Sequence, residues 1–289
     1  MSENKIIKAI KDKGKTLEAE MSFFDHLEAL RWHLVRASIA IVIFTAVVFY
    51  YYDWIFDTII MGPSKSTFWT YRMLCKIGAA LHRDGFCIDK VNIKLINTEM
   101  AGQFTLQINS ALIIGITLGV PYLIWEIWRF IKPALHDAER KAATGFVFYA
   151  CVLFFLGITF GYFVITPMSI NFLSSYTVSA VIQNLFDIDS YISSVATLTL
   201  ATGVVFQLPI IVYILANLGV MTPKFMKETR RYAIVVILVI AAVVTPTPDM
   251  LTMTVVSIPL FMLYEVSIVV AGLVEKRKIK KELDFEKGN

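Results

Sequence analysis

The sequence predicts an all-α integral membrane protein with six transmembrane helices and both termini on the cytoplasmic side. Of its 289 residues, 57% are hydrophobic and only 17% are charged, against roughly 45–50% and about 25% in soluble domains. The hydrophobic residues also fall in blocks of about 20, the length that crosses a bilayer. These observations exclude most soluble enzymes and nucleic-acid-binding proteins. We therefore expect the chain to be surrounded by the lipid bilayer and to bind no nucleic acid.

Six apolar stretches define the expected spans, at about 34–52, 104–131, 145–166, 192–218, 232–244 and 251–274. None alternates with the period of a barrel strand, and a helix satisfies its own backbone in lipid, so all six are expected to be helices. The fifth stretch reaches only about 20 Å, short of the roughly 30 Å hydrocarbon layer. The fifth and sixth segments therefore form either a re-entrant hairpin or, as we prefer, two short spans in a locally thinned bilayer.

The basic residues predict the orientation. Of 27 Lys and Arg, 21 lie before Ala37, in the loops near 129–141 and 224–231, or after residue 275, and the other six lie in a long outer loop. Basic residues gather on the cytoplasmic side, which places both termini there. The expected organisation is a cytoplasmic segment 1–33 with an interfacial helix, a six-helix domain 34–274 with an outer loop at 53–103, and a charged cytoplasmic tail 275–289.

The first 20 residues contain acidic side chains and no apolar run, unlike a cleavable signal or transit peptide, which favours the inner (plasma) membrane of a bacterium. No metalloprotease, serine-hydrolase or phosphate-loop motif is present. The four histidines, His26, His33, His82 and His136, lack the spacing of metal ligands. We therefore expect no enzyme activity, no cofactor and no metal.

The segment before the first span has the pattern of an amphipathic helix. Ser22 begins it with the spacing of a capping box, and apolar residues then recur on one face at Phe23, Leu27, Leu30 and Leu34. Asp25, Glu28 and Arg31 lie on the opposite face. Such a helix is expected along the cytoplasmic membrane surface with its carboxylates toward the cytosol. The alternative is that these charges only solvate an interfacial helix.

The first inner loop offers further carboxylates. Pro133 is placed to open a short helix, from which Asp137 and Glu139 project into a basic, aromatic-rich surface. With Glu28 they form two acidic points suited to a dibasic ligand, since guanidinium and carboxylate pair bidentately. The alternative is that they are solvated partners of neighbouring basic residues.

Two polar residues fall inside predicted spans, Gln207 in the fourth and Glu265 in the sixth. Polar groups at such depth usually face the bundle interior and have a role; the alternative is a packing hydrogen bond between spans. They also leave open a rival function, a secondary transporter with a midplane site. In the outer loop Cys75 and Cys87 are a possible disulfide, the alternative being two free thiols, and Cys151 lies in the third span.

Four ordered motifs together resemble the TatC family, the multispanning subunit of the twin-arginine protein translocase. They are Phe24-Asp-His-Leu-Glu-Ala-Leu-Arg31, Phe130-Ile-Lys-Pro-Ala-Leu-His-Asp-Ala-Glu139, Phe206-Gln-Leu-Pro209 and Thr245-Pro-Thr-Pro-Asp249. The resemblance implies a receptor that binds twin-arginine signal peptides of folded precursors on the cytoplasmic face. It also implies single-span TatA/TatB-type partners, self-association in the complex and transport driven by the proton-motive force. A purely structural assembly subunit is the third reading.

The resemblance implies a role in signal-peptide binding for residues of the amino-terminal motif and of the first inner loop: His26, Leu27, Leu30, Arg31, Phe130, Pro133 and Glu139. The carboxylates found from the residue pattern complete the expected site: Asp25, Glu28 and Asp137. Two departures affect it. The family usually has glutamate where this chain has Ala29, one residue after Glu28, which on a helix is a rotation of about 100°. Gln207 stands where the family often has glutamate, and an amide cannot relay a proton. The stretch 64–92 has no assigned function.

Overall fold

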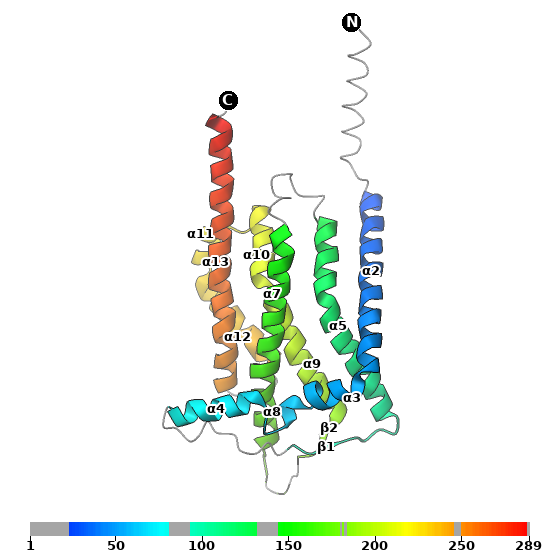
Figure 1. Cartoon of the computed structure of the whole chain (residues 1–289). Coiled ribbons are helices and arrows are strands. Elements are labelled where there is room, and N and C mark those ends of the chain that lie inside the picture. Colours follow the sequence, from blue (N-terminus) through cyan, green and yellow to red (C-terminus); the bar gives the residue numbers. More distant parts are fainter. Residues whose placement is uncertain are drawn as a thin grey trace.

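The computed structural model describes residues 23–80, 93–131, 144–179, 181, 184–245 and 250–287. Long helices stand side by side and form a bundle, with the first described residue of α2 and the last of α13 at the same end, below called the end of the termini (Figure 1). The bundle consists of α2 (Phe23–Tyr50), α5 (Gly102–Ile131), α7 (Thr144–Phe160), η5 (Gly161–Ile165), α8 (Thr166–Ser175), α9 (Ile188–Val205), α10 (Leu208–Asn217), α11 (Pro223–Glu228), α12 (Arg230–Val244) and α13 (Met250–Lys287).

Five helical segments are long and apolar enough to cross a membrane: Glu28–Tyr50, Gly102–Phe130, Val147–Ser175, Ile188–Asn217 and Thr252–Lys280. Each overlaps one predicted stretch, so the helical fold class is confirmed, and five of the predicted stretches are helices of the length and composition of a membrane span. The remaining stretch corresponds to α12, whose 15 residues measure about 22 Å at 1.5 Å per residue. Its brevity was predicted, and the count of six crossings remains a prediction.

Two helices extend beyond the expected bounds of their spans. From Phe23 onward the amino-terminal segment is continuous with the first span as α2, because no Gly or Pro interrupts residues 23–50. The last span likewise continues into the expected charged tail. α13 has 38 residues and continues to Lys287, since residues 275–287 contain no helix breaker before Gly288.

Close helix packing joins α2 to α5. A Cβ on Gly115 of α5 would lie 2.8 Å from the Cα of Thr45 on α2, and one on Gly119 would lie 2.6 Å from Cγ1 of Ile41. Only glycine fits such an approach, as is usual where membrane helices pack backbone to backbone. The two helices are therefore fixed along most of their length.

The end of the bundle away from the termini has its own small elements. They are α3 (Tyr52–Ile55), η1 (Phe56–Ile60), η2 (Gly62–Ser64), α4 (Trp69–Ala80) and the parallel pair β1 (Leu95–Ile96) and β2 (Phe186–Asp187). Two tyrosines join these elements to the bundle: the hydroxyl of the buried Tyr191 donates to the Ile60 carbonyl (2.9 Å), and that of the partly exposed Tyr162 donates to the Ile59 carbonyl (2.6 Å).

Candidate functional site

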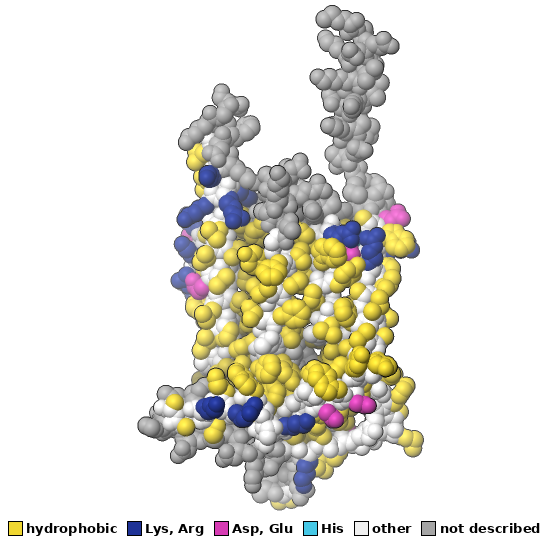
Figure 2. All heavy atoms as spheres, viewed as in Figure 1, with side chains coloured by type: hydrophobic (Ala, Val, Ile, Leu, Met, Phe, Trp, Pro, Cys, Tyr) yellow, Lys and Arg dark blue, Asp and Glu magenta, His cyan; other side chains and the backbone are white. Residues whose placement is uncertain are grey.

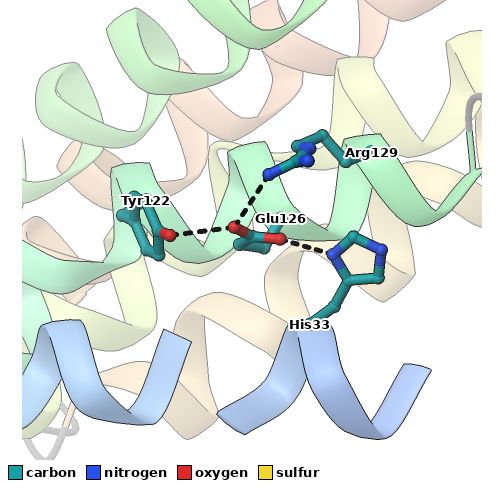
Figure 3. Close-up of polar contacts among 4 residues, drawn as sticks. All are labelled: His33, Tyr122, Glu126 and Arg129. Carbon is teal, nitrogen blue, oxygen red and sulfur yellow. Dashed lines mark hydrogen bonds and ion pairs between the residues drawn. The ribbon is translucent and has the colours of Figure 1, made fainter. Parts of the chain in front are cut away.

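A buried carboxylate joins α2 and α5 at the end of the bundle that carries the termini. Glu126 of α5 is only 1% exposed. Its Oε1 accepts a hydrogen bond from the Tyr122 hydroxyl at 2.9 Å and lies 3.4 Å from Nη1 of Arg129. Its Oε2 contacts Nδ1 of His33, which comes from α2 (Figure 3). Below, these four residues are called the Glu126 cluster.

The helical repeat explains the cluster. Tyr122, Glu126 and Arg129 recur at i, i+4 and i+7 and so share one face of α5, while His33 faces them from α2. A buried carboxylate is costly unless it is paired and hydrogen-bonded, and here three donors satisfy it. The cluster therefore fixes the rotation of α2 against α5 at this end.

The predicted binding residues lie just beyond the cluster. The ring of Phe130 meets that of His33 edge-on, with centroids 6.2 Å apart. On α2, Glu28 and Arg31 are exposed and precede His33; the Arg31 guanidinium lies 5.9 Å from the Trp32 ring. On α2, Glu28 precedes His33 by five residues and so lies about 7.5 Å from it along the helix axis. On α5, Phe130 follows Glu126 by four residues, about 6 Å along the axis. Because the two helices run antiparallel (Figure 1), these two steps go in the same direction from the His33–Glu126 contact, and Glu28 and Phe130 lie at about the same level of the bundle.

The rest of the predicted site is only partly visible. Leu30 is exposed on α2 beside Glu28. Pro133, Asp137 and Glu139 lie outside the described residues, and so do the side chains of Asp25, His26 and Leu27. Thus the structure places Glu28, Leu30 and Arg31 on α2 and Phe130 at the end of α5, and the assignment of all the predicted residues to a binding site stays a prediction.

Sequence reasoning missed Glu126 and His33. A signal was present, because Glu126 falls inside the predicted stretch 104–131, where an ionisable side chain is costly and usually functional. Its partner was not evident, since 93 residues separate His33 from Glu126. Only the antiparallel packing of α2 on α5 brings them together.

The two polar residues inside predicted spans have separate partners. Gln207 sits between α9 and α10 and donates from Nε2 to the carbonyl of Ala150 on α7 at 3.1 Å, an interhelical packing bond. Glu265 on α13 pairs through Oε2 with Nη2 of Arg230 at 2.8 Å, while its other oxygen is buried without a partner among the described residues. The two side chains share no hydrogen bond with each other among the described residues.

An apolar cavity of about 230 Å³ lies between α5, η5 and α9 and is lined mostly by Ile, Leu and Val side chains. Neither Gln207 nor Glu265 lines it. Among the described residues no three His, Cys, Asp or Glu side chains gather as a metal site. Cys151 is a free thiol. Cys75 is disulfide-bonded; Cys87 lies outside the described residues, so the pairing stays a prediction.

Comparison with known proteins matches this arrangement to one family. The model of the Sec-independent protein translocase protein (TatC) family matches residues 25–259. A TatC protein of Blattabacterium sp. subsp. Periplaneta americana is 37% identical over 266 residues, which are 91% of this chain and 100% of that protein. The TatC protein of Deinococcus radiodurans is 33% identical over 88% of this chain and 86% of its own length.

Solved structures agree. A crystal structure described as the twin arginine translocase receptor TatC superposes with a TM-score of 0.61 at 29% identity, covering 86% of this chain and 99% of that one. A second, of the same receptor in DDM, gives 0.65 at 30% identity over 85% and 99%. With the family model matching most of the chain and relatives aligning along nearly their whole length, this protein belongs to the TatC family of Sec-independent protein translocase components.

Proposed function

We propose that this chain is the receptor subunit of a twin-arginine translocase and binds the signal peptides of folded precursors at the end of α2 and α5. The observation that supports it most is the Glu126 cluster, which holds Glu28 on α2 and Phe130 on α5 at one level. The loop that follows Phe130 contains Asp137 and Glu139. Carboxylates from both segments would then meet the two guanidinium groups of the ligand, each pairing bidentately.

The orientation belongs to the same proposal. The apolar band on the surface is bordered by Lys and Arg side chains near the end of the termini (Figure 2). Arg31 and Arg36 on α2 and Arg129 on α5 are exposed. Basic residues favour the cytoplasmic side. We therefore place both termini in the cytosol, with α12 as a short sixth crossing in the inner membrane of a bacterium, where the precursors are made.

The proposed partners are single-span proteins of the TatA/TatB type and further copies of this chain. Large apolar side chains are exposed along the described spans, for example Val42 on α2 and Phe148 on α7. Lipid covers such a band in isolation, and helices with an apolar face can replace that lipid. The proton-motive force is proposed to drive transport, since no nucleotide-binding loop is present in the sequence.

Two substitutions test the site. Glu139→Ala should abolish export of a twin-arginine reporter while the protein stays in the membrane; normal export would contradict the assignment of Glu139.

Glu28→Lys should weaken crosslinking of a twin-arginine signal peptide about ten-fold, since an exposed ion pair contributes up to about 1 kcal/mol and its reversal a repulsion of similar size. Unchanged crosslinking would mean that the loop carboxylates suffice.

Glu275→Lys is the matched control. Glu275 is an exposed glutamate on α13, away from the α2–α5 pair, and reversal of its charge should leave crosslinking unchanged.

Co-purification with single-span proteins would support the translocase over the rival transporter. Uptake of a small solute by the reconstituted protein would favour the transporter.

A further inference from the structure

Helix α4 differs from the rest of the fold in direction. It leaves the bundle and lies across the spans, at the end away from the termini (Figure 1). It belongs to the outer loop stretch 64–92, to which the sequence assigns no function. The inference below concerns this end alone and is independent of the proposed signal-peptide site.

Buried contacts fix α4 in this position. The Tyr71 hydroxyl lies 2.9 Å from the Pro63 carbonyl and 3.2 Å from that of Pro167, and burial raises the pKa of this phenol. Thr70 donates from Oγ1 to the carbonyl of Phe163 on η5. Phe68, just before the helix, stacks on Phe163 with ring centroids 5.5 Å apart. One side of α4 is thereby attached to the third span.

The other side of α4 combines apolar and cationic groups. Trp69 and Met73 are 51% and 43% exposed and lie one turn apart. Arg72 and Lys76 are also exposed, also one turn apart, and neither forms an ion pair with any residue in the described ranges. At 100° per residue the two pairs occupy adjoining stripes. This is the pattern of a helix that lies in a membrane interface.

The level of α4 coincides with the edge of the apolar surface. Figure 2 shows the hydrophobic band ending at this height, with Lys and Arg side chains over α4 directly at its border. Three aromatic residues at the junction of α2 and α3, Tyr50, Tyr51 and Trp54, are exposed. Exposed Tyr and Trp at the end of a span mark the membrane–water interface, so α4 lies at headgroup depth.

We propose that α4 is an interfacial helix that binds anionic phospholipids in the leaflet away from the chain termini. Trp69 and Met73 enter the boundary between headgroups and acyl chains, and Arg72 and Lys76 pair with headgroup phosphates. The lipid is favoured as the occupant because the exposed apolar stripe continues the lipid-facing band and because Arg72 and Lys76, which pair with no acidic side chain in the part of the chain that the structure describes, complement phosphate. The helix thereby sets the depth of this end of the bundle in the bilayer.

The test uses the full chain reconstituted in nanodiscs. The part of the tryptophan emission that disappears in Trp69→Phe reports on α4. In the wild type it should be quenched by phospholipids brominated on their acyl chains near the headgroup and not by aqueous iodide. Quenching by iodide alone would place α4 in water and overturn the proposal, and so would shielding that appears only when other translocase subunits are added, which would indicate a protein partner.

A second measurement tests the cations. Lipid analysis of protein from nanodiscs of mixed phosphatidylcholine and phosphatidylglycerol gives the preference for the anionic lipid. Each basic residue near an anionic surface contributes about 1 kcal/mol, so Arg72→Gln combined with Lys76→Gln should lower that preference by up to about thirty-fold. Lys224→Gln with Lys227→Gln, a pair on α11 at the other end of the molecule, is the matched control for the lipid preference. Wild-type preference in the α4 double variant would overturn phosphate binding.

Discussion

Removal of the Glu126 carboxylate is the most informative perturbation of this structure. Glu126→Ala deletes one hydrogen bond from a neutral phenol, one contact with the His33 imidazole and one ion pair with Arg129. Hydrogen bonds contribute about 1 kcal/mol when neutral and about 1.5–3 kcal/mol when one partner is charged. The half-exposed arginine adds at most about 1 kcal/mol. We therefore expect a loss of about 3–5 kcal/mol in the free energy of unfolding.

More conservative substitutions should show how much each contact of Glu126 contributes to this loss of unfolding free energy. Glu126→Gln keeps the shape and an acceptor for the Tyr122 hydroxyl, so it should cost only about 1–2 kcal/mol. Tyr122→Phe removes a single bond and should cost about 1 kcal/mol. Glu99→Ala, an exposed glutamate at the other end of α5, is the control and should have no measurable effect.

The assay is unfolding by denaturing detergent of the purified protein, followed in a double-mutant cycle of His33→Ala and Glu126→Ala. If the two side chains interact as the structure shows, the cycle should give a coupling of about 1–3 kcal/mol. Signal-peptide crosslinking should fall in Glu126→Ala and be largely retained in Glu126→Gln, because the cluster positions the site. Additive losses, with a coupling under about 0.5 kcal/mol, would refute the role of this contact in joining α2 to α5.

Three further predictions concern other contacts. Gly115→Ala should destabilise the protein by about 1–3 kcal/mol in the same assay, because its Cβ would meet the α2 backbone at 2.8 Å, whereas Gly272→Ala, with its nearest neighbour at 3.9 Å, should not. Lys278→Met should cost about 1–2 kcal/mol, since Nζ donates to two carbonyls at the carboxyl end of α10. The Thr98 hydroxyl donates to the Asp187 carboxylate and lowers the pKa of that carboxyl group. The hydrogen bond therefore stabilises the fold fully above the pKa that Asp187 has in the unfolded chain, and this stabilisation is lost as the pH falls through the lower pKa that Asp187 has in the folded protein. Thr98→Val should therefore melt below the wild type at neutral pH, and the difference should shrink below about pH 4.

Much of the helical framework could be predicted from the sequence. The apolar blocks of α5, α9–α10 and α13 are long, and a backbone in lipid has few alternatives to a helix. The brevity of α12 was also evident from the length of its apolar run. Helix ends were less predictable: α2 begins at Phe23 and α13 ends at Lys287 because polar residues without Gly or Pro continue a helix as readily as apolar ones.

The candidate site was predictable only where it depends on local sequence. Glu28 and Arg31 were found because they lie opposite an apolar stripe on their own helix. Glu126 and His33 were not, since each is a lone polar residue whose meaning depends on a partner in another span. Long-range pairs of this kind follow from which helices pack together, and hydrophobic patterning does not specify that choice.

The π-helical segment η5 in the third span changes how that span must be interpreted. At 100° per residue, Phe154 of α7 and Ile170 of α8 would lie about 160° apart on an uninterrupted helix, yet both are buried. A π turn accommodates one extra residue without the rotation of about 100° that this residue would add in an α-helix. Phe154 and Ile170 are therefore only about 60° apart around the helix axis and can face the same side. The span is thus two helices in series with different phases. A one-residue deletion within Gly161–Ile165 would therefore convert the π turn into an ordinary α-helical turn and leave α8 in its present phase, with Thr166 and Ser169 still buried, whereas a one-residue insertion there would rotate all of α8 by about 100°.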